Sequence, residues 1–336
     1  MGSLLRYRPR AAVHSLCTWL MLSIFASIGL GAPATAQTYP NRPIHLIVPF
    51  APGAIVDLAA RVAAERIGSA LGQSVVIENR PGASGNTGIA QVLQSRADGY
   101  TLGFTSDSIV AINPHIYAHM PFDPLTDPAC VGMVGSATQI LIVRPDLEAA
   151  NLGEFIALAR SHPGQFSYGS AGAGSTLHLG AHLFASMAGI TLTHVPYKGA
   201  APALVDLVAG RIDLMSVTAV SVMPQIRAGA VRVLAVGGNT RMSALPTVPS
   251  TEEAGLPGYK STLWFGVIAP HETAPGIVET LNAALRAIPE DPAARRRLDQ
   301  AFIEPMPLTP LQMSTLIRAD WQRWQPIIRA AGVHLE

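Results

Sequence analysis

Charged side chains and cysteines are scarce in this sequence, and each scarcity excludes a class of protein. Only 13% of the 336 residues are charged and the formal net charge is +1. A nucleic-acid-binding protein would need a basic patch, which this composition does not supply. The two cysteines are Cys17, inside an N-terminal apolar run, and Cys130. Nothing beside Cys130 marks it as reactive, so we expect a buried structural thiol without a disulfide partner.

Motifs for catalysis and for metal binding are also missing. The sequence contains no H-E-x-x-H and no C-x-x-C, so no metal site is expected. An α/β hydrolase needs G-x-S-x-G, which Gly82-Ala-Ser-Gly85 and Gly169-Ser-Ala-Gly172 both miss. Gly172-Ala-Gly174 lacks the third glycine of a dinucleotide loop, because position 177 is leucine. We therefore expect a protein that is not an enzyme and holds no cofactor, with an exported hydrolase as a less favoured alternative.

The N-terminus has the pattern of a cleaved export signal. Three arginines (Arg6, Arg8 and Arg10) precede an apolar run from Leu16 to Leu30, and Ala34-Thr35-Ala36 is a small-residue cleavage site. The run is short for a membrane span. Residues 1–36 are therefore predicted to be a signal peptide, and the mature protein is expected to begin at Gln37 in the periplasm.

The stretch from Ile44 to Asp57 suggests an anion-binding loop. A short apolar strand, Ile44 to Val48, is broken by Pro49, Pro52 and Gly53, and helical spacing follows. The first N–H groups of a helix have no internal acceptor, and the helix dipole makes that end positive. The loop has no lysine or arginine, which favours a small carboxylate held by main-chain donors over a polyanion.

The same strand, glycine-rich loop and helix recur along the chain. Glycine-rich helix starts follow strands at Gly82 to Gly88 and at Ala171 to His178, and the strand Tyr100 to Thr105 ends in a polar cluster. This alternation predicts an α/β fold with parallel, doubly wound sheets, in which ligands bind beyond the carboxyl ends of the strands. The last helix, Pro310 to Ala330, has an apolar face that we expect to pack on a core.

At this point the sequence resembles the Bug-type solute receptors, the periplasmic binding components of tripartite tricarboxylate transporters. The resemblance covers nearly the whole mature chain. It rests on short motifs in a fixed order: Tyr39-Pro-Asn-Arg-Pro-Ile44, Pro49-Phe-Ala-Pro-Gly53 with Asp57, Glu78-Asn-Arg-Pro-Gly-Ala83 with Gly85-Asn86, Asp98-Gly-Tyr-Thr101, His194-Val-Pro-Tyr-Lys-Gly199 and Glu253-Ala-Gly-Leu-Pro-Gly258.

The resemblance implies a two-lobed periplasmic binding protein (Venus-flytrap), type II-like, with two crossing strands. Lobe 1 is predicted to comprise residues 37–139 plus 263–336, and lobe 2 residues 140–262. The implied ligand is a small carboxylate held between the lobes, and the implied partners are the membrane permease subunits of the transporter. The receptor is expected to act as a monomer. A sensor protein is an alternative partner that the sequence does not separate from a permease.

Candidate ligand contacts follow from the helix starts and strand ends, together with this resemblance. For Asp57, ligand contact and ordering of its own loop are equally compatible with the sequence. For His178, ligand contact and a structural role are equally compatible with it. The predicted ligand-binding residues are Phe50, Gly53, Ala54, Asp57, Ser84, Gly85, Asn86, Thr105, Ser106, Gly172, Ser175, Thr176, His178 and Tyr197.

Two positions depart from the family pattern. Ala54 stands where the family usually has a second glycine, so its methyl group would disfavour a positive φ angle. Val217 stands where many relatives have aspartate, which suggests a more apolar or differently charged ligand. Dicarboxylates, amino acids and aromatic acids all remain open as ligands.

Overall fold

The computed structural model describes residue 2 and residues 39–334, so the predicted signal peptide lies outside the described residues. The chain from Arg42 to Glu336 forms one compact unit. Its strands are β1 (Ile44–Val48), β2 (Val75–Asn79), β3 (Thr101–Ser106), β4 (Pro128–Val143), β5 (Ser167–Ser170), β6 (Thr193–Pro196), β7 (Leu214–Thr218), β8 (Arg232–Val236), β9 (Thr262–Pro270) and β10 (Glu304–Pro305).

Helices follow most of these strands, as the alternating sequence pattern predicts. The α-helices are α2 (Ile55–Leu71), α3 (Asn86–Leu93), α4 (Asn113–Ile116), α5 (Leu152–Ser161), α6 (Thr176–Ala188), α7 (Ala200–Val208), α8 (Met223–Arg227), α9 (Pro275–Arg286), α10 (Pro292–Gln300) and α11 (Pro310–Ala331). Short 3₁₀ turns η1 (Ala83–Gly85), η3 (Ala219–Ser221) and η4 (Ile288–Glu290) and the π-helix η2 (Ser108–Ile112) complete the set.

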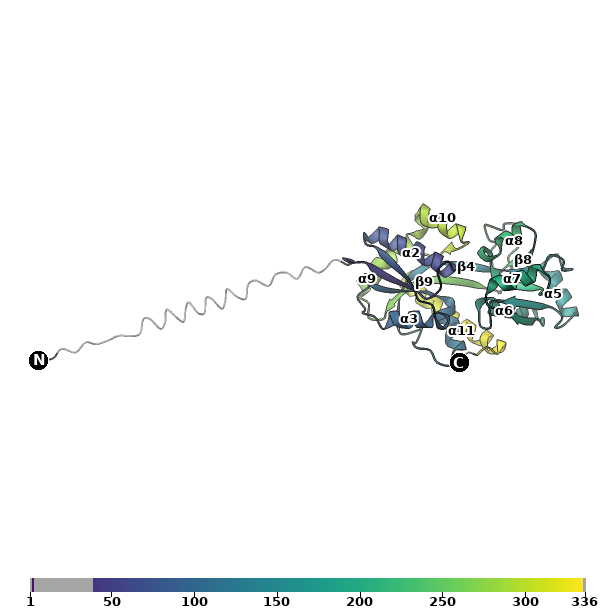
Figure 1. Ribbon diagram of the computed structural model, residues 1–336, viewed down its shortest axis with the longest axis horizontal. Coiled ribbons are helices and arrows are strands. Elements are labelled where there is room, and N and C mark those ends of the chain that lie inside the picture. The colour runs from purple at the N-terminus through teal and green to yellow at the C-terminus, as the bar shows by residue number, and fades with distance from the viewer. Residues whose placement is uncertain (1, 3–38, 335–336) are drawn as a thin grey trace. The chain divides into compact units, whose positions relative to one another are not determined.

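The strands join in one mixed sheet of order β2-β1-β3-β9-β4-β7-β5-β6, with β8 and β10 paired to β4. Strands β1, β2 and β3 are mutually parallel, as predicted, and β5 is parallel to both β6 and β7. Strand β4 pairs with β9 through residues 128–138 and with β7 and β8 through residues 139–143. We call β1, β2, β3, β9, β10 and residues 128–138 of β4 the first sheet half, and β5, β6, β7, β8 and residues 139–143 of β4 the second sheet half (Figure 1).

Strand β4 begins much earlier than the sequence pattern indicated. The predicted strand started at Ile140, whereas β4 starts at Pro128 and has bulges after Cys130 and Met133. Gly135 interrupts the apolar pattern because β10 approaches there: a Cβ atom on it would lie 2.7 Å from the backbone oxygen of Glu304. Close backbone approaches of this kind require glycine and thereby hide a strand from periodicity.

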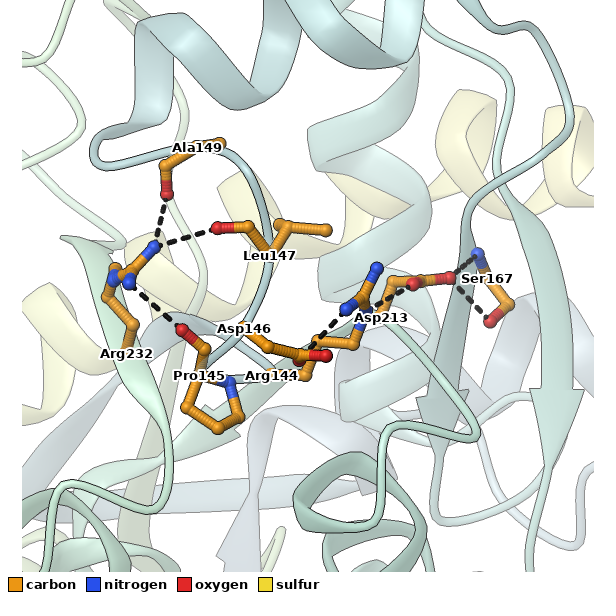
Figure 2. A network of polar contacts seen from close by, with 8 residues as sticks. All are labelled: Arg144, Pro145, Asp146, Leu147, Ala149, Ser167, Asp213 and Arg232. Atoms are coloured by element: carbon orange, nitrogen blue, oxygen red, sulfur yellow. Dashed lines mark hydrogen bonds and ion pairs between the residues drawn. The ribbon is translucent and has the colours of Figure 1, made fainter.

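Arginines anchor the edge of the second sheet half where β4 ends and β5, β7 and β8 begin (Figure 2). Arg232 donates to three backbone oxygens, those of Pro145, Leu147 and Ala149. Arg144 pairs with Asp213, which also accepts from the N–H and hydroxyl of Ser167. These ionic groups have structural partners and lie at the edge opposite the carboxyl ends of β5 and β7.

The C-terminal helix α11 packs against η2, α4 and β4, and also against α6. Its predicted apolar face is confirmed as core: Trp324 and Ile328 are buried, while Trp321 and Ile327 are partly buried against the same cluster. That cluster includes Ile112 of η2 and Leu179 of α6. Helix α11 therefore connects elements that lie on both sheet halves.

Candidate functional site

Loops after parallel strands gather at one edge in each sheet half. The loops after β1, β2 and β3 begin the helical segments α2, η1 and η2, and those after β5 and β6 begin α6 and α7. A cavity of about 310 Å³ is lined from both halves. Its polar lining residues are Ser84, Ser106, Ser108, Asn113, Ser175 and Thr176, and its apolar side chains are Phe50, Val56, Ile116, Ala171, Ala173, Leu263 and Phe265, with Gly174 beside them.

Five of the predicted site residues line this cavity: Phe50, Ser84, Ser106, Ser175 and Thr176. Sequence reasoning missed Ser108 and Asn113 from the segment after β3, and Leu263 and Phe265 from β9. The polar cluster at the end of β3 was a signal for Ser108. No local pattern could have revealed Leu263 and Phe265, because β9 reaches the cavity only through its pairing with β3 and β4.

Asp57 stabilises the loop between β1 and α2, which we call the first loop, through buried hydrogen bonds. It is 1% exposed, and its carboxylate accepts from the backbone N–H of Gly53 (2.9 Å), from the guanidinium of Arg61 (2.9 Å) and from the amide of Asn79 (2.9 Å). Asn79 also donates to the Phe50 oxygen at 3.0 Å. Burial by itself raises the pKa of Asp57, but these hydrogen bonds outweigh it and lower the pKa overall. Asp57 thus orders the loop, which is one of its two predicted roles.

The start of α2 has open backbone donors. The N–H of Gly53 donates to Asp57 and that of Ala54 to Ala51, whereas among the described residues the N–H groups of Ile55 and Val56 meet no acceptor. Gly53 has a φ of 83°, but Ala54 has a φ of −66°, so its methyl group adds no backbone strain. Ala54 keeps the negative φ angle that its methyl group favours, because the left-handed position falls on Gly53.

Replacing Asp57 with asparagine is expected to lower the free energy of unfolding by about 2 kcal/mol, because it removes charge-assisted hydrogen bonds from a buried network. The folded-state pKa of Asp57 lies below its unfolded value, so its stabilisation exists above the unfolded pKa and is lost as the pH falls through the folded pKa. Urea unfolding of both proteins across acidic pH measures the difference, which should shrink in acid. The exposed Asp299→Asn change, in an ion pair with Arg295, is the control and should have far less effect. Equal stability of Asp57→Asn and wild type at neutral pH would contradict this role.

The loop after β2, which we call the second loop, contains residues with left-handed backbone conformations. Gly82, Ala83, Ser84 and Gly85 all have positive φ angles, of 151°, 45°, 53° and 98°. Non-glycine residues in this region are strained, and such strain concentrates at ligand sites. Ser84 is held by two side chains: its backbone oxygen accepts from Asn113 (3.2 Å) and its hydroxyl from Tyr117 (2.9 Å).

The predicted contacts Gly85 and Asn86 lie behind this loop. A Cβ atom on Gly85 would lie 2.7 Å from Ile109, so this position packs tightly. The buried Asn86 accepts a 2.7 Å hydrogen bond from Asn113. Asn86 thus positions Asn113, which does line the cavity.

At the end of β3 the side chains alternate between the cavity and the interior. Ser106 and Ser108 line the cavity and share a 2.8 Å hydrogen bond. Thr105 is fully buried, and its hydroxyl meets no partner among the described residues. Asp107 is 1% exposed, and its burial, with the nearby Asp320 carboxylate, raises its pKa to about 7.

The start of α6 forms the second-half wall of the cavity. Ser175 caps the helix by accepting from the His178 N–H at 3.2 Å, and its hydroxyl donates to the Gly172 oxygen at 2.7 Å. Among the described residues, the N–H groups of Thr176 and Leu177 meet no acceptor. The cavity is therefore reached by two helix starts with open donors, at Val56 and at Thr176.

Stacked imidazoles support this loop from behind. His178 stacks on His194 at 3.9 Å between ring centroids, and its Nδ1 accepts from the Gly174 N–H at 3.1 Å. The Nε2 atom of His194 lies 2.7 Å from the hydroxyl of Ser170, which also accepts from the Gly172 N–H. Burial, followed by the charges of His194 and His182, lowers the pKa of His178 to about 4. His178 is thus a neutral support for the loop.

Two further positions singled out from the sequence lie outside the cavity lining. Tyr197 packs against the core of the second sheet half and donates to Asp206 at 2.8 Å. Val217 is 1% exposed and borders an apolar groove of about 600 Å³ between α7 and α8. Gly53, Ala54 and Gly172 belong to the loops that carry lining residues but do not line the cavity themselves.

A larger hollow of about 700 Å³ lies beside Arg241 and Arg295. Its charges are already paired, Arg241 with Glu253 and Arg295 with Asp299, and none of the predicted site residues lines it. The smaller cavity at the strand ends is therefore the better candidate site. Among the described residues, no group of acidic, histidine or cysteine side chains could hold a metal ion, and no helix could cross a membrane.

Comparisons with known proteins define the class of protein and then the family. The fold is that of the periplasmic binding proteins: BugD, described as a periplasmic binding protein, has a TM-score of 0.73 at 31% identity over 89% of this chain and all of that one. The model of the tripartite tricarboxylate transporter family receptor (TctC) matches residues 59–333, and the chain belongs to this family. The family consists of receptors and not of enzymes.

Individual relatives agree with this assignment. Protein BugT of Bordetella pertussis is 36% identical over 94% of this chain and 98% of its own. A Rhodopseudomonas palustris protein solved with adipate has a TM-score of 0.77 at 36% identity, covering 88% of this chain and 99% of that one. MatC from the same organism, solved with malate, has a TM-score of 0.72 at 29% identity, covering 86% of this chain and 100% of that one.

Proposed function

We propose that the protein is a periplasmic receptor that binds a small carboxylate between two lobes, residues 37–139 plus 263–336 and residues 140–262, and delivers it to the membrane subunits of a tripartite tricarboxylate transporter. The observation that carries the proposal is the cavity on which the starts of α2 and α6 converge with hydroxyl groups. Open N–H donors and hydroxyls suit a carboxylate, since both donate hydrogen bonds to its oxygens. The R. palustris relative solved with adipate and MatC solved with malate support this ligand class.

Binding would couple to closure of the lobes. Polar contacts come from the first sheet half through Ser84 and Asn113, and from the second through Ser175 and Thr176. A ligand that bridges both sets binds the closed arrangement better than the open one and therefore shifts the population toward it. The closed form is then what the membrane subunits would recognise. We also propose export through cleavage of residues 1–36, so that the mature receptor begins at Gln37.

The experiment is a thermal-shift panel on the mature chain, from Gln37 to Glu336, with small carboxylates and with matched sugars and amines. A ligand present at about 100 times its Kd should add about 2.7 kcal/mol to the free energy of unfolding. That corresponds to several degrees, by the scaling of roughly 2–4 °C per kcal/mol that holds for somewhat smaller domains. A shift confined to carboxylates would support the receptor proposal. A shift with sugars or amines and with no carboxylate would overturn it.

A further inference from the structure

Among the residues that the structure describes, none with an ionisable side chain lines the cavity. Its polar side chains carry hydroxyls and one amide, and the remaining lining side chains are aliphatic or aromatic. This composition suits a carboxylate that receives hydrogen bonds, but it offers no negative charge to an ammonium group. A desolvated ammonium without a carboxylate partner loses hydration that neutral acceptors replace only in part. The lining therefore discriminates between acids with and without an amino group.

Asp57, a carboxylate close to the cavity in sequence, is not free to serve an ammonium. Its neighbour Val56 lines the cavity, but Asp57 itself is buried and its oxygens accept from Gly53, Arg61 and Asn79. An ammonium group would have to displace the hydrogen bond from the Gly53 N–H to Asp57, which orders the first loop.

Asp107 is turned away from the cavity as well. Ser106 and Ser108 on either side of it line the cavity, whereas the Asp107 carboxylate meets the backbone N–H groups of Ser108 and Trp264 and lies near Asp320 and Arg323 of α11. Trp264 lies between Leu263 and Phe265, which line the cavity, and its indole donates to Asp320 at 2.6 Å. Since neighbouring residues of a strand face opposite sides, Trp264 faces α11, and Asp107 lies near the Asp320 and Arg323 side chains of that helix.

Apolar side chains fill the space between the polar groups of the two sheet halves. Phe50 and Val56 come from the first loop and α2, Leu263 and Phe265 from β9, and Ile116 from α4. These walls suit a hydrocarbon body. We infer that the ligand is a small carboxylic acid with an apolar or hydroxylated body and no ammonium group. This inference rests on the proposed carboxylate-receptor function and narrows its ligand class.

The test is calorimetry of the mature chain with acid pairs that differ only in the amino group: succinate and L-aspartate, glutarate and L-glutamate, adipate and L-2-aminoadipate, 3-phenylpropanoate and L-phenylalanine. In every pair that binds, the acid without the amino group should bind at least about 10-fold more tightly, a difference of about 1.4 kcal/mol. An amino acid that binds as tightly as its partner would overturn the inference and leave the receptor proposal standing. Failure of all eight acids to bind would count against the receptor proposal itself and, with it, this inference.

A variant that supplies the missing charge sharpens the test. Ala173 is exposed on the loop before α6 and lines the cavity, so Ala173→Asp adds a carboxylate with little risk to folding. The ratio of the two affinities within a pair should move by about 10-fold toward the amino acid. Ala173→Asn, of the same size but neutral, is the control and should leave the ratio unchanged. An unchanged ratio in Ala173→Asp would refute the charge argument.

Discussion

Replacing Thr176 with aspartate is expected to weaken carboxylate binding by about 100-fold or more while the apo protein stays as stable as the wild type. Thr176 is the first residue of α6 and lines the cavity, so the new carboxylate would stand where, in our proposal, the ligand's carboxylate accepts hydrogen bonds from the open N–H groups. Two like charges at one helix start repel each other by several kcal/mol when water is largely excluded. The same charge stabilises the isolated helix, because an acidic residue in the first turn complements the dipole. Binding of the acid identified in the panel is measured by calorimetry, and stability by urea unfolding.

The control for Thr176→Asp places the same charge in the first turn of another helix. Leu311 is 76% exposed at the start of α11 and does not line the cavity. Leu311→Asp should leave the Kd within a factor of about two, which is the size expected for a screened distant charge. Unchanged ligand affinity in Thr176→Asp would show that the start of α6 does not hold the carboxylate.

Replacing Gly180 with alanine is expected to lower the free energy of unfolding by about 3 kcal/mol. Gly180 lies in α6 where the helix crosses β4, β7 and the start of β9, and an added Cβ atom would press on the side chain of Gln139 and lie 2.6 Å from the Ser261 hydroxyl. Gln139 there accepts from Ser216 (2.6 Å) and Ser261 (2.7 Å) in a buried cluster. Overpacking such a cluster strains it or breaks its hydrogen bonds. Chemical denaturation measures the loss.

Gly276 provides the matched control for this prediction. It lies in the first turn of α9, and an added Cβ atom there would meet no heavy atom within 4 Å. Gly276→Ala should be neutral or stabilise the protein by up to about 1 kcal/mol, as alanine does in an open helical position. If Gly180→Ala were as stable as Gly276→Ala, the buried cluster would have room that the structure does not show.

The parts of the site that could be predicted are those whose structure is determined by the sequence of one short segment. The strand and proline-glycine loop before Val56, and the glycine-rich start of α6 at Thr176, both marked helix starts with open donors. The strand-helix alternation likewise predicted the parallel arrangement of β1, β2 and β3. Short-range backbone geometry decides such features, and proline, glycine and apolar spacing record it.

Other site residues could be identified only from the folded structure. Asn113 lines the cavity and donates a hydrogen bond to the backbone oxygen of Ser84, which lies 29 positions earlier in the chain. Phe265 faces the cavity only because β9 lies between β3 and β4 in the sheet. His178 was a candidate ligand contact, yet its nitrogen accepts from Gly174 while its ring stacks on His194. No local pattern records these contacts, since each joins segments that are distant in the sequence or depends on the direction of a side chain.

The sequence by itself determined the alternation of strands and helices, the glycine-rich helix starts and the family, because these depend on local backbone preference and on short ordered motifs. Only the tertiary structure decided which of the polar groups reach the cavity. It turned Ser106 and Ser108 toward the cavity and the intervening Asp107 toward α11, and it used the Asp57 carboxylate within the first loop. The physical reason is that a ligand site is made by side-chain direction and by contacts between distant segments, such as the pairing of β9 with β3 and β4.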